Sequence, residues 1–572
     1  MPACLLLALS AALAGAPWQP DVDTQGRLFA RLGFIGDDWR DVWSLEGPVA
    51  HSHTGWVGPS LHVAASAEVP GAAAVSVRLA AAREDLSLLP HLEIGAGGLA
   101  RVELQDGQEQ RNLLLVSGPG EALNTWGWRV PLGRVPAEFS LRFELRGARL
   151  VDLALTSEDY RWAIIGPDGR APVNRAVFSA NHDPTDEQQM KVWHERMRLA
   201  WSRPFYEVSR DWKGPREVDW DAVRKRLEHH REVRTPLVLL HMGGLGHNEE
   251  GKPPADWEAF YADHRWLAEE FARRFPAREW DIKYVEMWNE PDDGFWFKAG
   301  WGGDPPHYSA FLQAASEGIK AGDPDMRVAL GGIADPAGSS LRSFLWPCLE
   351  QFRVGDRADA VALHGYYGDP AKCTWDRTVL ECRSICRRLA GRELPVLITE
   401  FNADFHEDFG RWLPFSKQSL YVAETLLHFL RRRVDAALYF CFGWLGSDFC
   451  PYYYDRDGKL IERPVVEAYA FYNDYAGQEL QVQAPDELLP LAACEHEGAA
   501  WVFLEYDGHT PVRIELAPEL AARVADEGQA FVFAGEKTQE PVPVKVADRA
   551  FTFPPAGARP PRGVVKVRLP GR

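Results

Sequence analysis

The chain has 572 residues, of which 46% are hydrophobic and 25% are charged, and both values are ordinary for globular proteins. This length exceeds the needs of one small core and favours two to four domains. The formal net charge of −19 comes from 82 acidic and 63 basic residues spread along the chain, which argues against a dedicated surface for nucleic acid or for an anionic membrane.

The chain begins with an apolar segment, MPACLLLALSAALAGAPW, that is about as long as the core of a signal peptide. Ala14-Gly15-Ala16 fits the small-x-small pattern of a cleavage site, although no Lys or Arg precedes Leu5. We therefore expect residues 1–16 to be a signal peptide and the mature protein to be secreted or periplasmic. A membrane anchor needs about 20 apolar residues, and no other stretch reaches that length.

Residues 17–158 are predicted to form an N-terminal β-sandwich of the jelly-roll kind, which could bind carbohydrate. The pattern here is short alternating runs, such as Leu141, Phe143 and Leu145 with charged residues between them. Gly and Pro punctuate these runs, and no convincing segment has a helical period. Alternation with a period of two is typical of strands that bury one face.

Residues 159–475 are predicted to form a (β/α)8 barrel, so the chain as a whole is of the α/β class. Short apolar runs alternate there with long amphipathic segments, such as residues 220–227, that have helical character. Eight alternations over roughly 300 residues fit a barrel better than an open doubly wound sheet. The eight runs are Arg175–Ala180, Leu199–Arg203, Pro236–His241, Ile282–Trp288, Met326–Gly331, Asp359–His364, Pro395–Glu400 and Ala436–Phe442.

Residues 476–572 are predicted to form a C-terminal β-sandwich, because alternation returns after the barrel. Val512, Ile514 and Leu516 follow the turn signal Asp507-Gly508. No tandem repeat or coiled coil is evident in the sequence.

Eight cysteines leave two interpretations open. Cys4 would be removed with the signal peptide, and Cys373, Cys382 and Cys386 are close enough in sequence for a local disulfide in an oxidising compartment. Their spacing lacks a zinc pattern. The alternative is that the cysteines are buried free thiols. The seven cysteines of the mature chain are Cys348, Cys373, Cys382, Cys386, Cys441, Cys450 and Cys494.

Polar or aromatic residues stand at the ends of seven of the eight predicted barrel strands. Reactive groups in a barrel lie where strands end and loops begin, so these residues are expected to line one pocket. For the histidines, a core or solvated position without a binding role is the plainer alternative. The strand-end residues are His182, Arg203, His241, Asn289, Glu290, His364, Glu400 and Trp444.

Glu290 and Glu400 end the fourth and seventh runs, which lie across the barrel mouth from each other. Cleavage of a glycosidic bond requires such a pair, because one carboxyl group protonates the leaving oxygen while the other attacks the anomeric carbon. Retention of configuration requires a separation of about 5–5.5 Å between the two groups. A single glutamate at such a position would more often be an acidic loop residue or the neighbour of a helix N-cap.

The segments around both glutamates resemble those of the clan A barrel glycosidases, and of glycoside hydrolase family 39 in particular. Glu290 lies in Glu286-Met287-Trp288-Asn289-Glu290-Pro291, and Glu400 ends Ile398-Thr399-Glu400. His364-Gly365-Tyr366 is similar to the His-x-Tyr of the family's sixth strand, and Trp296 and Trp444 are similar to its aromatic residues after strands four and eight. The resemblance covers residues 170–475. Family 39 includes β-xylosidases, α-iduronidases and exopolysaccharide hydrolases.

The resemblance implies a retaining glycoside hydrolase acting on an oligosaccharide or polysaccharide, with Glu290 as acid/base and Glu400 as nucleophile. It implies that Asn289 binds the sugar 2-hydroxyl and that His364 and Tyr366 orient Glu400. No metal or organic cofactor is expected. The 22 tryptophans of the chain suit such a substrate, because aromatic faces pack against sugar rings, although tryptophan also fills large cores.

The second strand departs from the family pattern. It reads Arg203-Pro204-Phe205, where the family's xylosidases tend to carry Arg-x-His. Either the −1 subsite accepts a different sugar, or His182 or His241 supplies the missing contact from a neighbouring strand. Two other functions stay open: a non-catalytic carbohydrate-binding protein that kept the barrel, and a transglycosylase that shares the covalent intermediate and differs in its acceptor.

Overall fold

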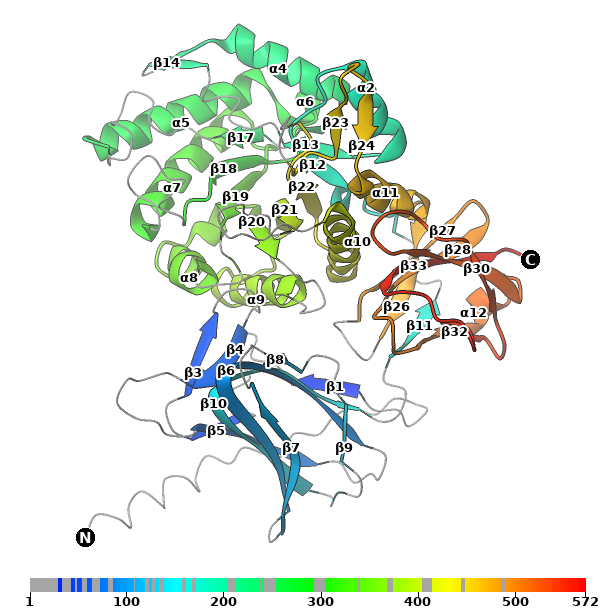
Figure 1. Cartoon of the computed structure of the whole chain (residues 1–572). Coiled ribbons are helices and arrows are strands. Elements are labelled where there is room, and N and C mark those ends of the chain that lie inside the picture. Colours follow the sequence, from blue (N-terminus) through cyan, green and yellow to red (C-terminus); the bar gives the residue numbers. More distant parts are fainter. Residues whose placement is uncertain are drawn as a thin grey trace, which may run out of the picture. The chain divides into compact units, whose positions relative to one another are not determined.

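The computed structural model shows a mixed α/β protein whose chain divides into two compact units (Figure 1). One unit comprises Met1–Ala163 and Gln483–Leu488, and the other comprises Ile164–Val482 and Leu489–Arg572. The predicted signal peptide lies outside the described residues. The structure describes residues 29–32, 43–46, 49–53, 59–63, 73–80, 86–106, 109–118, 123–125, 129–132, 135, 138–156, 161–166, 171–203, 211–214, 216–233, 235–236, 238–240, 254–292, 304–334, 336, 340–367, 374–403, 414–443, 448–484 and 489–572.

The first unit is built on one connected antiparallel sheet, with two long strands at its centre. Strand β6 (Ser87–Asp106) pairs with β10 (Glu138–Thr156) along nearly its whole length, and β5 (Ala73–Ala80) also pairs with β10. The predicted alternation is confirmed, since Leu141 and Phe143 are fully buried while Arg142 between them is partly exposed. A sheet domain therefore precedes the barrel, and its arrangement as a sandwich stays a prediction.

The remaining strands of this sheet are shorter. They are β1 (Phe29–Leu32), β2 (Trp43–Glu46), β3 (Val49–His53), β4 (Pro59–Val63), β7 (Glu109–Ser117), β8 (Leu123–Asn124) and β9 (Val130–Pro131).

The second unit contains a curled parallel sheet, as expected for a (β/α)8 barrel. Its hydrogen-bonded path begins at β16 and ends at β17, and these two strands are separated by a single residue of sequence. The first and last strands of the sheet therefore follow each other directly in sequence, which means that the sheet curls round on itself. Each of the eight predicted runs overlaps the strands, which are β12 (Ser179–Asn181), β13 (Trp201–Arg203), β16 (Thr235–Pro236), β17 (Val238–Leu240), β18 (Val285–Asn289), β19 (Val328–Ile333), β20 (Ala360–Tyr367), β21 (Val396–Ala403) and β22 (Ala436–Tyr439).

The first predicted run begins as a short 3₁₀ helix and not as a strand. This helix, η3 (Arg175–Val177), precedes β12. The side chain of Asn174 accepts a hydrogen bond from the Ala176 N–H, which satisfies a backbone donor locally and competes with strand pairing.

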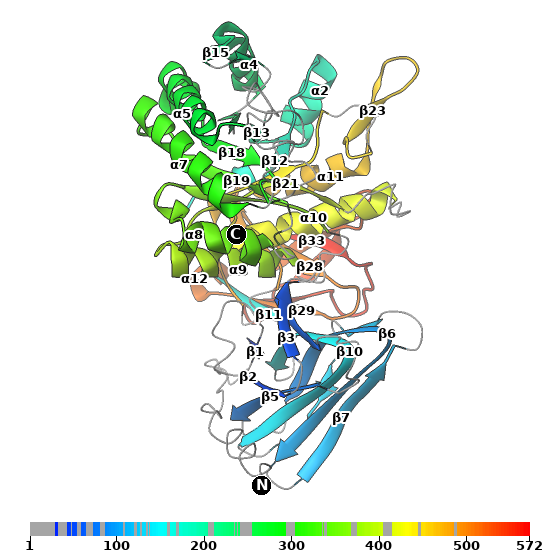
Figure 2. The ribbon, with the colours of Figure 1, turned by 90° about the vertical axis from the view of Figure 1, so that its left-hand side faces the viewer.

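Helices lie outside the parallel strands (Figures 1 and 2). Helix α7 begins with prolines at its first positions, where the missing N–H costs nothing, and α5 is capped by the Asp256 side chain. The helices around the sheet are α2 (Glu187–Lys191), α4 (Trp220–Val233), α5 (Trp257–Arg274), α6 (Ala277–Trp280), α7 (Pro305–Gly322), α8 (Trp346–Glu350), α9 (Thr374–Leu389), α10 (Phe415–Arg432) and α11 (Pro464–Phe471). Among the described helices, none combines the length and hydropathy that a membrane span requires.

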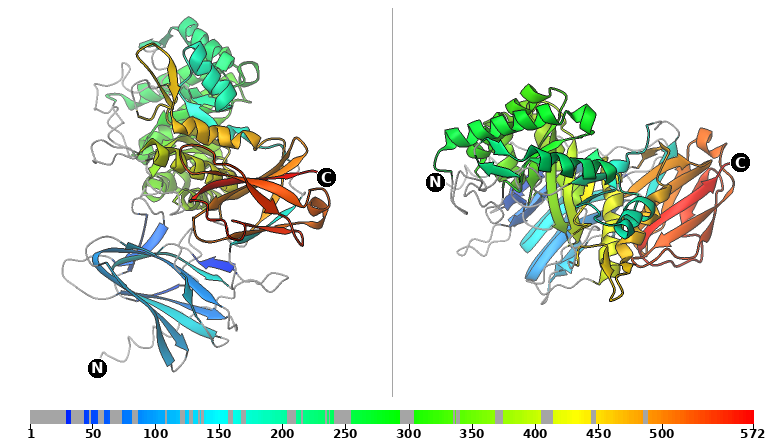
Figure 3. Two further views of the ribbon diagram at one scale, coloured as in Figure 1. Left: turned by 45° about the vertical axis from the view of Figure 1, so that its right-hand side comes forward. Right: turned by 90° about the horizontal axis from the view of Figure 1, so that it is seen from above.

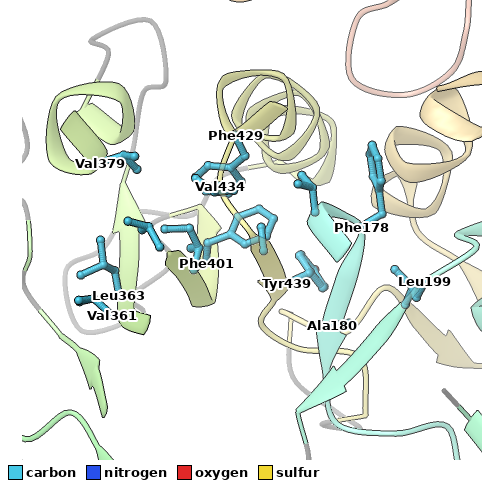
Figure 4. Packing of buried hydrophobic residues seen from close by; sticks show 14 of the residues in the cluster. Phe178, Ala180, Leu199, Val361, Leu363, Val379, Phe401, Phe429, Val434 and Tyr439 are labelled. Carbon is cyan, nitrogen blue, oxygen red and sulfur yellow. The ribbon is translucent and has the colours of Figure 1, made fainter. Parts of the chain in front are cut away.

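The core between strands and helices determines which way each strand residue points. Phe401 of β21 packs edge-on against Phe429 of α10, with ring centroids 5.0 Å apart, and also contacts Tyr439 of β22 (Figure 4). Successive side chains of a strand point to opposite faces. Because Phe401 points outward to the helices, its neighbour Glu400 points into the interior of the curled sheet.

The C-terminal part of the second unit consists of two further sheets (Figure 3). Strand β11 (Trp162–Gly166), which precedes the barrel in sequence, lies in the smaller of these sheets between β26 and β29. An ion pair between Arg562 and Glu424 of α10, at 2.9 and 3.0 Å, joins this part to the barrel. The six-stranded sheet has the order β25-β27-β28-β33-β30-β31 and the four-stranded sheet the order β26-β11-β29-β32.

The strands of these two sheets, with one short helix, α12 (Pro518–Ala521), are β25 (Gln478–Glu479), β26 (Gln481–Gln483), β27 (Leu491–His496), β28 (Ala499–Tyr506), β29 (Val512–Leu516), β30 (Glu527–Phe533), β31 (Val542–Lys545), β32 (Ala550–Phe553) and β33 (Gly563–Pro570). A hairpin of β23 (Tyr452–Tyr454) and β24 (Leu460–Glu462) precedes α11.

The cysteines that the structure describes are buried free thiols. Burial raises the pKa of Cys348 and of Cys494 to about 12, so both stay protonated and unreactive at neutral pH. Cys373 lies outside the described residues, while Cys382 and Cys386 are both free. The disulfide between these last two is therefore excluded.

Candidate active site

The candidate site lies at the carboxyl ends of the parallel strands, where four strands contribute side chains. Strand β13 contributes Arg203, β18 ends at Asn289 with Glu290 following it, β20 carries His364, and β21 carries Glu400. Parallel pairing aligns these strand ends, with Asn289 opposite Gly332 of β19 and His364 opposite Glu400. Residues far apart in sequence are thereby brought into direct contact.

The structure brings the two predicted glutamates together. Glu290 is 7% exposed and Glu400 is 4% exposed. One carboxylate oxygen of each, together with one ring nitrogen of His364, forms a group whose atoms all lie within 4.8 Å of one another. The His364 Nδ1 atom is 2.9 Å from Glu290 Oε1 and 3.7 Å from Glu400 Oε2.

Glu400 is surrounded by hydrogen-bond donors. Arg203 Nη1 donates to Glu400 Oε1 at 2.6 Å, and the Tyr366 hydroxyl donates to Oε2 at 2.5 Å. Burial and the charge of Glu400 raise the pKa of Tyr366 well above its ordinary value, so this phenol keeps its proton and remains a donor. Donors directed at both oxygens favour the ionised form of a carboxyl group.

Arg203 lies beneath the two glutamates and is completely buried. Besides Glu400, its guanidinium donates to Glu286 at 2.6 Å, to Asn289 Oδ1 at 2.8 Å and to Asn181 Oδ1 at 3.1 Å. Burial alone would lower the pKa of Arg203, but the charges of Glu286 and Glu400 more than offset this and raise it. A guanidinium bound on so many sides holds the strand ends in register.

Asn289 is oriented by its bond to Arg203. Because the side-chain oxygen accepts from Arg203 Nη2, the amide nitrogen is the group left to donate. A donor beside the two glutamates suits a hydroxyl group of a bound molecule.

Glu290 faces a buried histidine. His364 is 0% exposed, and its Nε2 atom lies 3.0 Å from the Thr399 hydroxyl oxygen. Burial lowers the pKa of His364, and the charge of Arg203 adds to this effect against the opposing carboxylates. The imidazole is therefore neutral at pH 7. Glu290 thus contacts His364, whereas Glu400 accepts hydrogen bonds from Arg203 and Tyr366.

The backbone around Glu290 is strained. Trp288 has φ 82° and Glu290 has φ 49°, both in the left-handed region that non-glycine residues seldom adopt. Each such residue costs roughly 1–3 kcal/mol, and such outliers cluster at functional sites. The buried Trp288 ring packs against Phe311 of α7 at 5.4 Å between centroids, which holds the strained segment in place.

His182 lies at the edge of the site, directly after β12. Its half-buried ring is in edge-to-face contact with Phe440, at 6.0 Å between centroids, and Phe440 makes the same kind of contact with Tyr366. The predicted residues His241, Trp296 and Trp444 lie outside the described residues, as do Pro204 and Phe205.

Among the residues of the site, Glu286, Asn181 and Phe440 were not predicted from the sequence as functional. Glu286 carried a readable signal, because a glutamate inside the apolar strand 285–289 must have a buried partner. Asn181 and Phe440 carried none, since an asparagine or a phenylalanine at a strand end is common.

Glu290, His364 and Glu400 could also present three ligand atoms to a metal ion. The guanidinium of Arg203, 2.6 Å from Glu400, opposes a second cation at this place. Both oxygens of Glu400 already accept hydrogen bonds. The donor set therefore suits acid/base and nucleophilic chemistry better than metal binding.

No family model matches the sequence, and no curated protein matches it. Solved structures do match the fold. A family GH39 β-xylosidase from Caulobacter crescentus is 18% identical, with a TM-score of 0.50 over 72% of this chain and 100% of the other. A glucosidase from Croceicoccus marinus is 12% identical, with a TM-score of 0.51 over 72% of this chain and 99% of the other.

A third match is the GH86 protein BuGH86, solved in complex with neoagarooctaose, at 14% identity and a TM-score of 0.51 over 72% of this chain and 78% of the other. At identities this low the likeness concerns the fold. The protein thus has a fold that is similar to that of barrel glycoside hydrolases.

Proposed function

We propose that this protein is a retaining glycoside hydrolase, in which Glu290 is the acid/base and Glu400 the nucleophile. The observation that carries the proposal is the closeness of two buried carboxyl groups that have different hydrogen-bond partners. One oxygen of Glu290 lies within 4.8 Å of one oxygen of Glu400. Such closeness suits retaining enzymes, whose carboxyl groups are about 5–5.5 Å apart, better than inverting enzymes, whose groups are about 6.5–9.5 Å apart to admit a water.

In the first step Glu400 attacks the anomeric carbon and a glycosyl-enzyme ester forms. The bond to the leaving oxygen breaks, and Glu290 gives its proton to that oxygen. In the second step Glu290, now ionised, takes a proton from a water molecule whose oxygen attacks the anomeric carbon and displaces Glu400. Two inversions give net retention, and the cycle needs no metal or organic cofactor.

The neighbouring residues support this cycle. Arg203 and Tyr366 hold Glu400 in position through their hydrogen bonds to its two oxygens. The amide nitrogen of Asn289 is available for the 2-hydroxyl of the sugar, a contact that strengthens as the transition state forms. Arg203, which the sequence predicted as a substrate contact, is better suited to positioning because it is completely buried.

We propose an oligosaccharide or polysaccharide as the substrate, met outside the cytoplasm after removal of residues 1–16. His182 would contact sugar hydroxyls at the edge of the site, and His241, Trp296 and Trp444 would extend the binding surface. The resemblance to family 39 supports this class of substrate. Because the second strand reads Arg203-Pro204-Phe205, we do not assign a xyloside.

The proposal is tested by incubating the full-length protein with a panel of aryl glycosides and polysaccharides. We expect hydrolysis of at least one substrate and a loss of at least about 1,000-fold in kcat for Glu400→Gln. Glu290→Gln should lose the most on substrates with poor leaving groups, which need the acid. Glu317→Gln, on the exposed face of α7, is the matched control.

Two outcomes would redirect the proposal. Unchanged hydrolysis in both active-site variants would remove the catalytic assignment. Binding of a polysaccharide without turnover by the wild-type protein would favour the non-catalytic alternative. Analysis of products formed with added sugar acceptors separates hydrolysis from transglycosylation, because only the latter builds longer chains.

A further inference from the structure

Beneath the two glutamates lies a third buried carboxylate that the proposed cycle does not use. Glu286 is 0% exposed and sits at the far end of a chain of hydrogen bonds that reaches Glu290. We infer that Glu286 and Thr399 are positioning residues that hold the proton of His364 on Nε2, so that Glu290 must be protonated to donate a hydrogen bond to Nδ1. This inference rests on the proposed function and concerns how that site keeps its acid protonated.

Glu286 accepts hydrogen bonds at both oxygens of its carboxylate. Its Oε2 atom accepts from Arg203 Nε at 2.6 Å, and its Oε1 atom accepts from the Gly332 N–H at 3.0 Å. A carboxylate paired with arginine at this distance is ionised and can only accept hydrogen bonds. The Thr399 hydroxyl, 2.9 Å from Oε1, therefore donates its one hydrogen to Glu286.

Thr399 determines which ring nitrogen of His364 carries the proton. With its hydrogen committed to Glu286, the Thr399 oxygen can only accept from His364 Nε2, which lies 3.0 Å away. Nε2 therefore carries the ring proton. The ring cannot turn away easily, because it rests directly on Gly332, where a Cβ atom would come within 2.0 Å of Nε2.

His364 in turn determines the protonation state of Glu290. A neutral imidazole protonated on Nε2 has a bare Nδ1, which accepts and does not donate. Glu290 Oε1 lies 2.9 Å from this nitrogen, a distance at which two acceptors would repel each other. Glu290 must therefore bring the hydrogen.

The charges around His364 are consistent with this state. Glu286 and Glu400 would favour an imidazolium, whereas complete burial and the charge of Arg203 oppose one. The charged groups that act on the ring from the packed elements are Arg203 on β13, Glu286, Glu290 and Asp292 on and after β18, and Glu400 on β21.

The same contact serves both halves of the proposed cycle. Before cleavage, the bare Nδ1 stabilises protonated Glu290 beside ionised Glu400. After the proton has left, an ionised Glu290 faces a lone pair, which makes it a stronger base toward the incoming water. The chain of hydrogen bonds from Glu286 through Thr399 and His364 thus favours the protonated form of Glu290 before cleavage, although Glu286 does not contact Glu290 itself.

The direct test is the ¹⁵N NMR spectrum of the His364 ring in the full-length protein labelled with ¹⁵N-histidine. His364→Gln identifies the resonances. We expect one protonated nitrogen at Nε2 and one bare nitrogen at Nδ1 at pH 7 and above. A doubly protonated ring, or a proton on Nδ1, in the wild-type protein would overturn the inference. This spectrum gives its answer whether or not the protein hydrolyses glycosides.

A second measurement tests whether the chain of hydrogen bonds from Glu286 to Glu290, here called the relay, affects catalysis. It follows the alkaline limb of the kcat/KM pH profile. Thr399→Val removes the hydroxyl at nearly constant volume, and we expect the limb to move about one pH unit lower, the worth of one hydrogen bond to the neutral acid. Thr399→Ser retains the hydroxyl and should restore the wild-type profile. An unmoved limb in Thr399→Val, in an enzyme that still depends on Glu290, would refute the relay alone.

Discussion

Arg203 allows the most detailed prediction, because its partners and their distances are all defined. Replacing it with methionine, which has a similar length and no charge, leaves Glu286 and Glu400 as two buried carboxylates without their cation. The pairs that disappear are 2.6 Å long and completely buried on the arginine side. Removing one partner of a buried ion pair costs about 3–5 kcal/mol, mainly through the charge left behind.

We therefore expect Arg203→Met to lower the free energy of unfolding by about 3–5 kcal/mol. Adding Glu286→Gln should recover part of this loss, because it removes one of the two uncompensated charges. Urea unfolding of the full chain, followed by tryptophan fluorescence and calorimetry to resolve the two units, measures both values. A loss below about 1 kcal/mol for Arg203→Met, or a double variant that is less stable than either single variant, would refute this account.

Two further predictions concern Gly332 and Tyr366 of the site, and a third concerns His428 of α10, which pairs with Asp376 of α9. Gly332→Ala should lower kcat/KM by 10-fold or more, because the added methyl group would displace the His364 ring that lies 2.0 Å away. Tyr366→Phe should reduce kcat by about 10–100-fold, since it removes one donor to the nucleophile. Despite burial, the charge of Asp376 raises the pKa of His428 to about 10, so its stabilising contribution is complete below pH 6.5 and is lost as pH rises to 10. His428→Gln should flatten that decline in denaturation experiments.

The sequence predicted the curled parallel sheet well, because alternating apolar runs and amphipathic segments repeat eight times. All eight predicted runs overlap strands of the curled sheet. It was less informative about the first strand, where the local bond from Asn174 shortens the strand to Ser179–Asn181. It also could not show that β11 joins the C-terminal sheet, since that pairing bridges more than 300 residues.

For the site, strand-end position was sufficient to select Glu290, His364 and Glu400, which the structure brings together. The sequence did not predict the contacts of the buried residues beneath them. The role of Glu286 depends on which atoms of Arg203 and Thr399 it meets, and a pattern of residue types does not contain hydrogen-bond directions. The burial of Arg203 likewise follows from tertiary packing and not from its place at a strand end.

The most direct test of the central claim is to trap the covalent intermediate. The wild-type protein is incubated with a 2-deoxy-2-fluoro glycoside of whichever sugar the substrate panel identifies, digested with protease and analysed by tandem mass spectrometry. We expect one fluoroglycosyl group per chain, attached to Glu400, and its slow release when an acceptor is added. Attachment to another carboxylate, or turnover of a good substrate with inverted configuration and no adduct, would contradict it.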